Sequence, residues 1–118
     1  MPYLMTKVNT ALPAEKERAL AEKFYDAISL IPGKAPEQLM MDFSDNCRMH
    51  FRGAGQQPPM AYLELKIFGY ADAAAFGAFS DAAVRALGEV LAVSPENVYV
   101  KFEEIRCWGT GNGVIAAD

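Results

Sequence analysis

The sequence predicts an α+β fold in which two β-α-β repeats form a four-stranded mixed sheet with two helices on one face, plus short extra strands. Two observations carry this prediction. The segment APEQLMMDF at 35–43 resembles SPENVYVKF at 94–102, an offset of 94 − 35 = 59 residues. The same offset places PYLMTKV at 2–8 on AYLELKI at 61–67. One offset that aligns two separate segments indicates a duplicated unit.

A chain of 118 residues suits one domain with one core. We therefore predict a single domain over residues 1–118, with internal repeats at roughly 2–52 and 61–105 and a C-terminal hairpin at 106–118.

The first repeat contains a predicted helix from Ala14 to Ile31, because apolar residues recur there every three or four positions. They are Leu20, Phe24, Ile28 and Ile31. Gly33 and Lys34 follow, and we expect the glycine to form the left-handed cap and the lysine to offset the negative helix end. The second repeat has the same spacing at Phe76, Phe79, Ala83, Leu87 and Val90. In each repeat the helix is long enough to make the flanking strands parallel.

Turn signals and short strands connect and follow the repeats. Asp45-Asn46 indicates a turn, residues 48–51 a short strand, and residues 53–59 a loop. Asn112-Gly113 favours a tight hairpin turn. The tail glycines do not form a phosphate loop, because no strand-to-helix step accompanies them.

The strand patterns indicate two different sheet faces. Leu63, Leu65 and Ile67 share one face of the third main strand, and Val98, Val100 and Phe102 share one face of the fourth. This apolar face belongs against the helices. The opposite face mixes charged residues with tyrosine, phenylalanine and methionine, which is unusual for a face left in water. We expect a partner there, and self-association is the simplest one.

Composition excludes several classes of function. The net charge is −4, and no basic cluster occurs, which argues against nucleic acid and anionic membranes as partners. No apolar run approaches the roughly 20 residues of a membrane span. The start lacks the features of a signal peptide, so we expect a cytoplasmic protein, with export by a non-classical route left open.

The cysteines and the histidine offer little chemistry. Cys47 and Cys107 are isolated, and we expect buried, reduced thiols and no metal site. His50 is the only histidine, and a structural role in an apolar strand is the expectation for it.

Several motifs in order give the chain a resemblance to the tautomerase superfamily, in particular to its macrophage migration inhibitory factor and D-dopachrome tautomerase branch. The matching segments cover essentially the whole chain: Met1-Pro2, Gly33-Lys34-Ala35-Pro36, Met49-His50-Phe51, Pro59, Phe68-Gly69, residues 94–99 and the Gly/Asn-rich tail. The resemblance implies a homotrimer with sites at the subunit interfaces and no cofactor. It also implies keto–enol tautomerisation of phenylpyruvate-like α-keto acids, a small-molecule substrate class.

The resemblance assigns catalysis to Pro2, freed by removal of Met1, and to Lys34. A free α-amine has a pKa of about 7.7–8, and an apolar pocket and a nearby cation both lower it toward the value that a base needs at neutral pH. Tyr3, Phe68 and Ile115 would supply the apolar wall. The backbone N–H of Phe68 and the Lys34 ammonium would bind the substrate carboxylate or the enolate oxygen. Tyr99 matches a pocket tyrosine from the adjacent subunit.

Departures from the family pattern leave alternatives open. Lys101 stands where the animal cytokine has asparagine; it could bind a second acidic group or pair with Glu103. Gln38 replaces an aromatic pocket residue. The cytokine's CxxC is absent, and so are the paired arginines of dehalogenating and decarboxylating relatives. The competing function is a cytokine-like or other binding protein on the same scaffold, with little or no catalysis.

Overall fold

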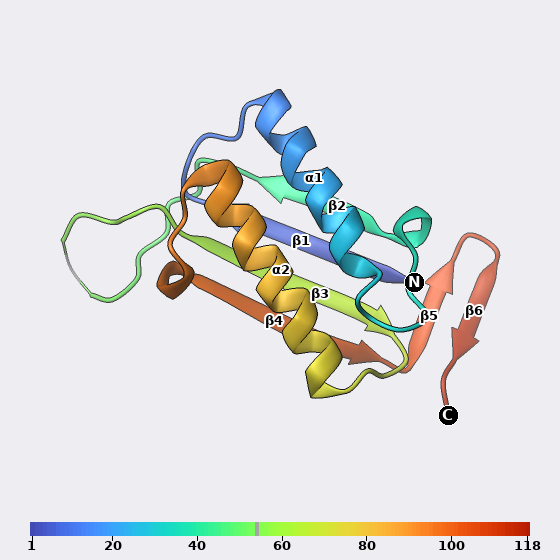
Figure 1. Ribbon diagram of the computed structural model, residues 1–118. Helices are drawn as coiled ribbons and strands as arrows, with labels where there is room; N and C mark the ends of the chain where they lie inside the picture. The colour runs from blue at the N-terminus through green and yellow to red at the C-terminus, as the bar shows by residue number, and fades with distance from the viewer. Residues whose placement is uncertain (54) are drawn as a thin grey trace.

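A computed structural model describes residues 1–53 and 55–118 as a sheet covered by two helices (Figure 1). The elements, in chain order, are β1 (Pro2–Val8), α1 (Ala14–Ile28), a 3₁₀ helix (Pro36–Gln38), β2 (Met40–Ser44), β3 (Ala61–Phe68), α2 (Ala73–Leu91), a 3₁₀ helix (Pro95–Asn97), β4 (Val98–Ile105), β5 (Cys107–Thr110) and β6 (Gly113–Ala116).

The main sheet has the strand order β2-β1-β3-β4. Each repeat contributes one parallel pair, β1 with β2 and β3 with β4, and the two repeats meet at the antiparallel pair β1–β3. In that pair Met5 lies opposite Glu64, and these two residues are also related by the 59-residue offset of the repeat. A local two-fold axis therefore passes through this pair. The predicted mixed sheet of two β-α-β repeats is confirmed.

Both helices cover one face of the sheet, as Figure 1 shows. Leu63, Leu65 and Ile67 of β3 are fully buried beneath them, as predicted from their alternation. The helix residues that pack on this face include Leu20, Phe24, Ile28, Phe79, Ala83 and Leu87. Burial of these side chains, at about 25 cal/mol per Å² of apolar surface, supplies the main stabilisation of the domain.

The first helix ends earlier than predicted. Ser29 is its C-cap with ordinary right-handed backbone angles, and the chain then makes tight turns whose N–H groups at Leu30 and Ile31 donate to Ala27 and Ile28. Ile31 is buried beyond the helix, so its spacing reflected core packing and not helix length. Gly33 does have a positive φ of 80°, but it lies in the following turn and does not cap the helix.

Two loop predictions also need correction. Residues 48–51 form no strand, because no strand of the described chain pairs with them; the Phe51 N–H instead donates to Gln57 Oε1 at 2.9 Å. Ala54, part of the predicted loop 53–59, lies outside the described residues. The C-terminal hairpin is confirmed, but its two-residue turn is Gly111-Asn112, and Gly113 begins β6 with a φ of 128°.

No helix among the described residues covers the opposite face of the sheet. Met40 on β2 is 69% exposed and Tyr99 on β4 is 63% exposed. Large apolar side chains in water are costly, and their position here agrees with the expectation of a partner on this face. Neither helix of the described chain combines the length and apolarity that a bilayer crossing requires.

Candidate functional site at the N-terminus

Pro2 opens β1 at a buried position opposite Ile67 of β3. It lines a cavity of about 490 Å³, within the usual size of small-molecule sites. The walls come from the N-terminal residues 1–3, Gln38, Met40, Lys66 and residues 108–111 of the hairpin. Three of the sequence-predicted site residues, Pro2, Tyr3 and Gln38, therefore meet in one cavity.

Phe68 connects the chain start to Lys34. Its N–H donates to the Met1 carbonyl at 3.0 Å, and its own carbonyl accepts from Lys34 Nζ at 2.7 Å. The Lys34 side chain thus contacts the end of β3, although Lys34 follows α1 closely in the sequence. An ammonium has three N–H donors, so two remain for other partners.

Burial and charge both act on the amines here. Burial lowers the pKa of the Met1 α-amino group, and the positive charge of Lys34 lowers it further. Burial also lowers the pKa of the Lys34 ammonium. The Met1 α-amine is therefore easier to deprotonate than an exposed one.

Tyr3 forms part of the cavity wall, and its side chain lies near both Lys66 and Asp42. Lys66 Nζ lies 5.8 Å from the centre of its ring. Its pKa is raised, mainly by burial, then by a hydrogen bond to Asp42, and further by the charges of Asp42 and Glu64. The tyrosine therefore stays a neutral phenol at physiological pH.

Four charged side chains form a network across the helix-free face of the sheet. Lys66 Nζ lies 3.0 Å from Glu64 and 4.0 Å from Glu103, while Lys101 Nζ lies 3.0 Å from Glu103 and 3.9 Å from Glu64. Hydrogen bonds from Lys66 and Tyr62 lower the pKa of Glu64, although burial opposes them. In this chain Lys101 pairs with Glu103, one of the two roles that the sequence left open.

Tyr99 lies at the other end of the sheet from Pro2. It pairs with Tyr62 in the β3–β4 register, whereas Pro2 lies opposite Ile67. Tyr99 lines a separate cavity of about 340 Å³ and packs edge-to-face on Phe51, with 5.0 Å between ring centres. Neither Tyr99 nor Lys101 is among the residues that line the Pro2 cavity within one chain.

The hairpin contributes a different residue from the one expected. Ile115 on β6 pairs with Trp108 on β5, and Trp108, not Ile115, is among the lining residues. Sequence reasoning missed Trp108, Met40 and Lys66. The signal for Lys66 was present, because it shares a face of its strand with Phe68. Nothing in the sequence indicated that Trp108 belongs to the site, because the C-terminal tail aligns with the family pattern only through a gap.

The cysteines and His50 stay outside the Pro2 cavity. Cys47 is half-buried and Cys107 is exposed, and both are free thiols, so the expectation that they are buried is wrong. Cys47 follows the end of β2 and Cys107 begins β5, and both lie outside the core. His50 is exposed and lies in no strand, so the structural role expected for it in a strand is wrong. In residues 1–53 and 55–118, His, Cys, Asp and Glu side chains do not gather in groups of three that could hold a metal ion.

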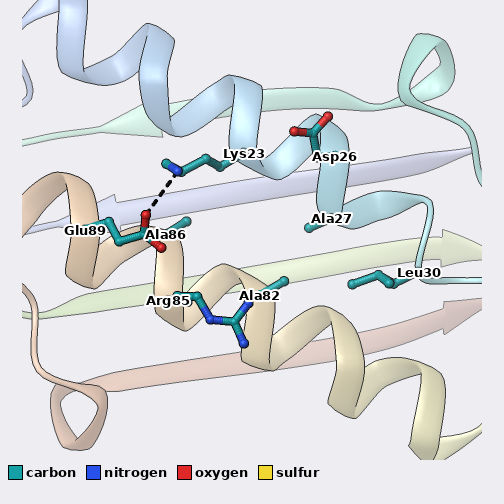
Figure 2. A pocket seen from close by; sticks show the side chains of 8 residues that line it. All are labelled: Lys23, Asp26, Ala27, Leu30, Ala82, Arg85, Ala86 and Glu89. Atoms are coloured by element: carbon teal, nitrogen blue, oxygen red, sulfur yellow. Dashed lines mark hydrogen bonds and ion pairs between the residues drawn. The ribbon is translucent and has the colours of Figure 1, made fainter.

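A shallow groove of about 250 Å³ runs between the outer faces of α1 and α2 (Figure 2). Ala27, Ala82 and Ala86 line it, and Lys23 Nζ bridges it to Glu89 at 3.2 Å. The pair is half-exposed, and such pairs contribute only about 0–1 kcal/mol. None of the predicted site residues lies in this groove.

Comparisons with known proteins agree with this architecture. A family model described as macrophage migration inhibitory factor (MIF) matches residues 1–116. The crystal structure of Leishmania major MIF2 superimposes with a TM-score of 0.88 at 22% identity, covering 98% of this chain and 97% of that chain. The macrophage migration inhibitory factor homologue from Prochlorococcus marinus gives a TM-score of 0.82 at 21% identity, covering 95% and 97%.

A third similar structure is that of Pt0534 inactivated by 2-oxo-3-pentynoate, with a TM-score of 0.80 at 19% identity, covering 94% of this chain and 93% of that chain. No curated protein matches the sequence at a significant level. At these identities the structural matches establish the fold.

Proposed function

The chain belongs to the macrophage migration inhibitory factor family, and from this premise we propose that it is a cofactor-independent keto–enol tautomerase of phenylpyruvate-like α-keto acids, with Pro2 as general base. The observation that carries the proposal is the position of Pro2, buried at the start of β1 on the wall of a 490 Å³ cavity. Loss of Met1 turns the Pro2 nitrogen from an amide into a secondary amine with a basic lone pair.

The reaction moves one proton and changes no oxidation state. The Pro2 nitrogen takes a proton from the carbon next to the ketone, and the electron pair of that C–H bond forms the enolate. The enolate oxygen then accepts a proton to give the enol, and the reverse sequence restores the ketone. General acid–base catalysis of this kind typically contributes about 10²–10⁴-fold.

Lys34 and Phe68 bind the anionic part of the substrate in this proposal. Lys34 Nζ uses one N–H on the Phe68 carbonyl at 2.7 Å, which leaves two for a carboxylate or an enolate oxygen. The Phe68 N–H donates to the Met1 carbonyl at 3.0 Å, so loss of Met1 frees this donor as well as the base. One processing step thus exposes both groups.

A trimer completes the site in this proposal. Tyr99 and Lys101 lie on the helix-free face, and a neighbouring copy packed on that face brings its Tyr99 and Lys101 toward Pro2. The 63% exposure of Tyr99 in the single chain supports this assignment. Tyr3 and Gln38, together with Trp108 in place of the expected Ile115, complete the substrate contacts.

The test uses protein whose mass shows that Met1 is absent. Ketonisation of enol phenylpyruvate, followed by ultraviolet absorbance, should be fast and should fall by about 10²-fold or more in Pro2→Gly. Protein that retains Met1 should be inactive too, because its Pro2 nitrogen is an amide. Turnover that survives in Pro2→Gly would remove Pro2 as the base.

A covalent probe gives a second readout. The amine nitrogen of Pro2 should add to the alkyne carbon C4 of 2-oxo-3-pentynoate, with a proton passing to C3, so the mass rises by one reagent molecule. Pro2 should carry the label after digestion. A correctly processed assembly with neither turnover nor label would instead favour the cytokine-like or other binding function, which needs no free proline amine.

A further inference from the structure

We propose that Lys66 binds a second anionic group of the substrate, so that the site prefers α-keto acids with a second carboxylate at the end remote from the keto acid. This inference rests on the proposed function, since it names the substrate class of the same cavity. Lys66 is the only lysine or arginine among the described residues that line the Pro2 cavity.

The two lysines near Pro2 occupy different places. Lys34 Nζ is held at the Phe68 carbonyl beside the chain start, whereas Lys66 lies on the cavity wall with its Nζ 5.8 Å from the Tyr3 ring. A substrate whose keto acid end lies at Pro2 and Lys34 therefore presents its far end to the wall that contains Lys66. A cation on that wall favours an anionic far end over a bare phenyl ring.

Lys66 can turn to a ligand without leaving its present partners unpaired. Glu103 keeps Lys101 at 3.0 Å, and Glu64 keeps Lys101 at 3.9 Å and the Tyr62 hydroxyl at 3.0 Å. Removing one partner from a buried charge is costly mainly when the other charge is left alone. Here both glutamates retain a partner, so the cost of moving Lys66 is small.

Lys23 is the matched comparison. It is also an ion-paired lysine, with Glu89 at 3.2 Å, and it lies in the groove between α1 and α2, which contains none of the residues proposed for the substrate site. Lys66→Met and Lys23→Met thus each remove one ion-paired lysine, and only the first changes the wall of the Pro2 cavity.

Binding can be measured without turnover, because Trp108 is the only tryptophan and lines the same cavity. The probes are phenylacetate and 4-carboxyphenylacetate, which differ by one carboxylate at the far end and contain no ketone. Titration of Trp108 fluorescence in the processed protein should give tighter binding of the dicarboxylate. Lys66→Met should weaken that binding about tenfold, and phenylacetate binding should change less than about twofold.

Two further variants decide the outcome. Lys23→Met should leave the ratio of the two dissociation constants within about twofold of the parent, and Lys66→Arg should retain the preference for the dicarboxylate. An equal loss for both ligands in Lys66→Met, an unchanged ratio, or no binding of the dicarboxylate by the parent would overturn the proposal.

Failure of the proposed function would give a different pattern of results from failure of the Lys66 assignment. A Pro2→Gly protein should lose turnover of phenylpyruvate and still bind 4-carboxyphenylacetate through Lys66. If the processed parent binds the dicarboxylate in this Lys66-dependent way but turns over no keto acid, the tautomerase assignment fails while the assignment of Lys66 stands.

Discussion

Lys34 Nζ donates a 2.7 Å hydrogen bond to the backbone carbonyl of Phe68, across 34 residues of sequence. This contact fixes a positive charge beside the chain start, where it helps to lower the pKa of the α-amino group. The same carbonyl belongs to the residue whose N–H binds Met1. Lys34 therefore affects the N-terminus through its charge and through its hydrogen bond to Phe68, the last residue of β3.

Replacing Lys34 should change the pH profile of catalysis. In Lys34→Ala the pKa of the Pro2 amine in the processed protein should rise, because removal of a nearby positive charge makes the protonated amine more favourable. The proposed base works only when unprotonated, so the acidic limb of kcat/KM should move to higher pH. The plateau should also fall by about 10²-fold, as for other lost oxyanion donors.

Lys34→Arg is the control for charge. It keeps the cation, so the acidic limb should stay near its original pH even if the plateau falls. A limb that does not move in Lys34→Ala would show that Lys34 does not set the pKa of the base.

Glu64 should make stability depend on pH. Its pKa lies below the ordinary value of 4.5, chiefly because Lys66 and Tyr62 donate hydrogen bonds to the carboxylate. A carboxyl whose pKa is lower in the folded state stabilises the fold above the unfolded pKa, and this stabilisation disappears as pH falls through the folded pKa. Urea unfolding from pH 6 to pH 3 should show this loss, and Glu64→Gln should reduce it.

Glu22→Gln, at an exposed position on α1, should keep the parental loss of stability over the same pH range. If Glu22→Gln and Glu64→Gln reduce that loss equally, the Glu64 network is not its source.

Truncation of a core side chain on β3 should lower stability far more than truncation of an exposed leucine in the turn after α1. Leu65 is fully buried, and Leu65→Ala should lower the free energy of unfolding by about 2–5 kcal/mol. Leu30, which is 47% exposed, is the matched leucine, and Leu30→Ala should cost less than about 1 kcal/mol. Chemical denaturation measures both, and similar costs would contradict the assigned core.

The end of α2 offers a stabilising change. Ala92 caps this helix with a left-handed φ of 56°, a conformation that costs a residue with a Cβ about 1–2 kcal/mol. Ala92→Gly should therefore raise the free energy of unfolding by about 0.5–1 kcal/mol, after the greater entropy of glycine in the unfolded chain is included. Thermal unfolding should show a higher midpoint.

Ala21→Gly, within α1, should have the opposite effect and cost about 1 kcal/mol, because its backbone is helical. Two glycine variants that shift stability in the same direction would contradict the cap assignment.

The sequence alone was sufficient to predict the duplicated β-α-β unit, the two helices and the buried face of β3. These features depend on periodicity over a few residues: apolar side chains every second position in a strand, and every third or fourth in a helix. The same local signals misplaced the end of α1, since Ile31 continues the helical spacing although it is buried in a turn. They also suggested a strand at residues 48–51, with which no strand among the described residues pairs.

Only the tertiary structure determined the contacts between residues that lie far apart in the chain. Lys34 reads as a helix-end lysine, yet it contacts Phe68; Lys66 reads as a solvent-facing strand residue, yet it lines the cavity with Pro2 and Trp108. Tyr99 and Pro2 both belong to the predicted site, yet they lie at opposite ends of one chain's sheet. Such neighbours depend on strand register and on how the hairpin packs, which local propensity does not encode.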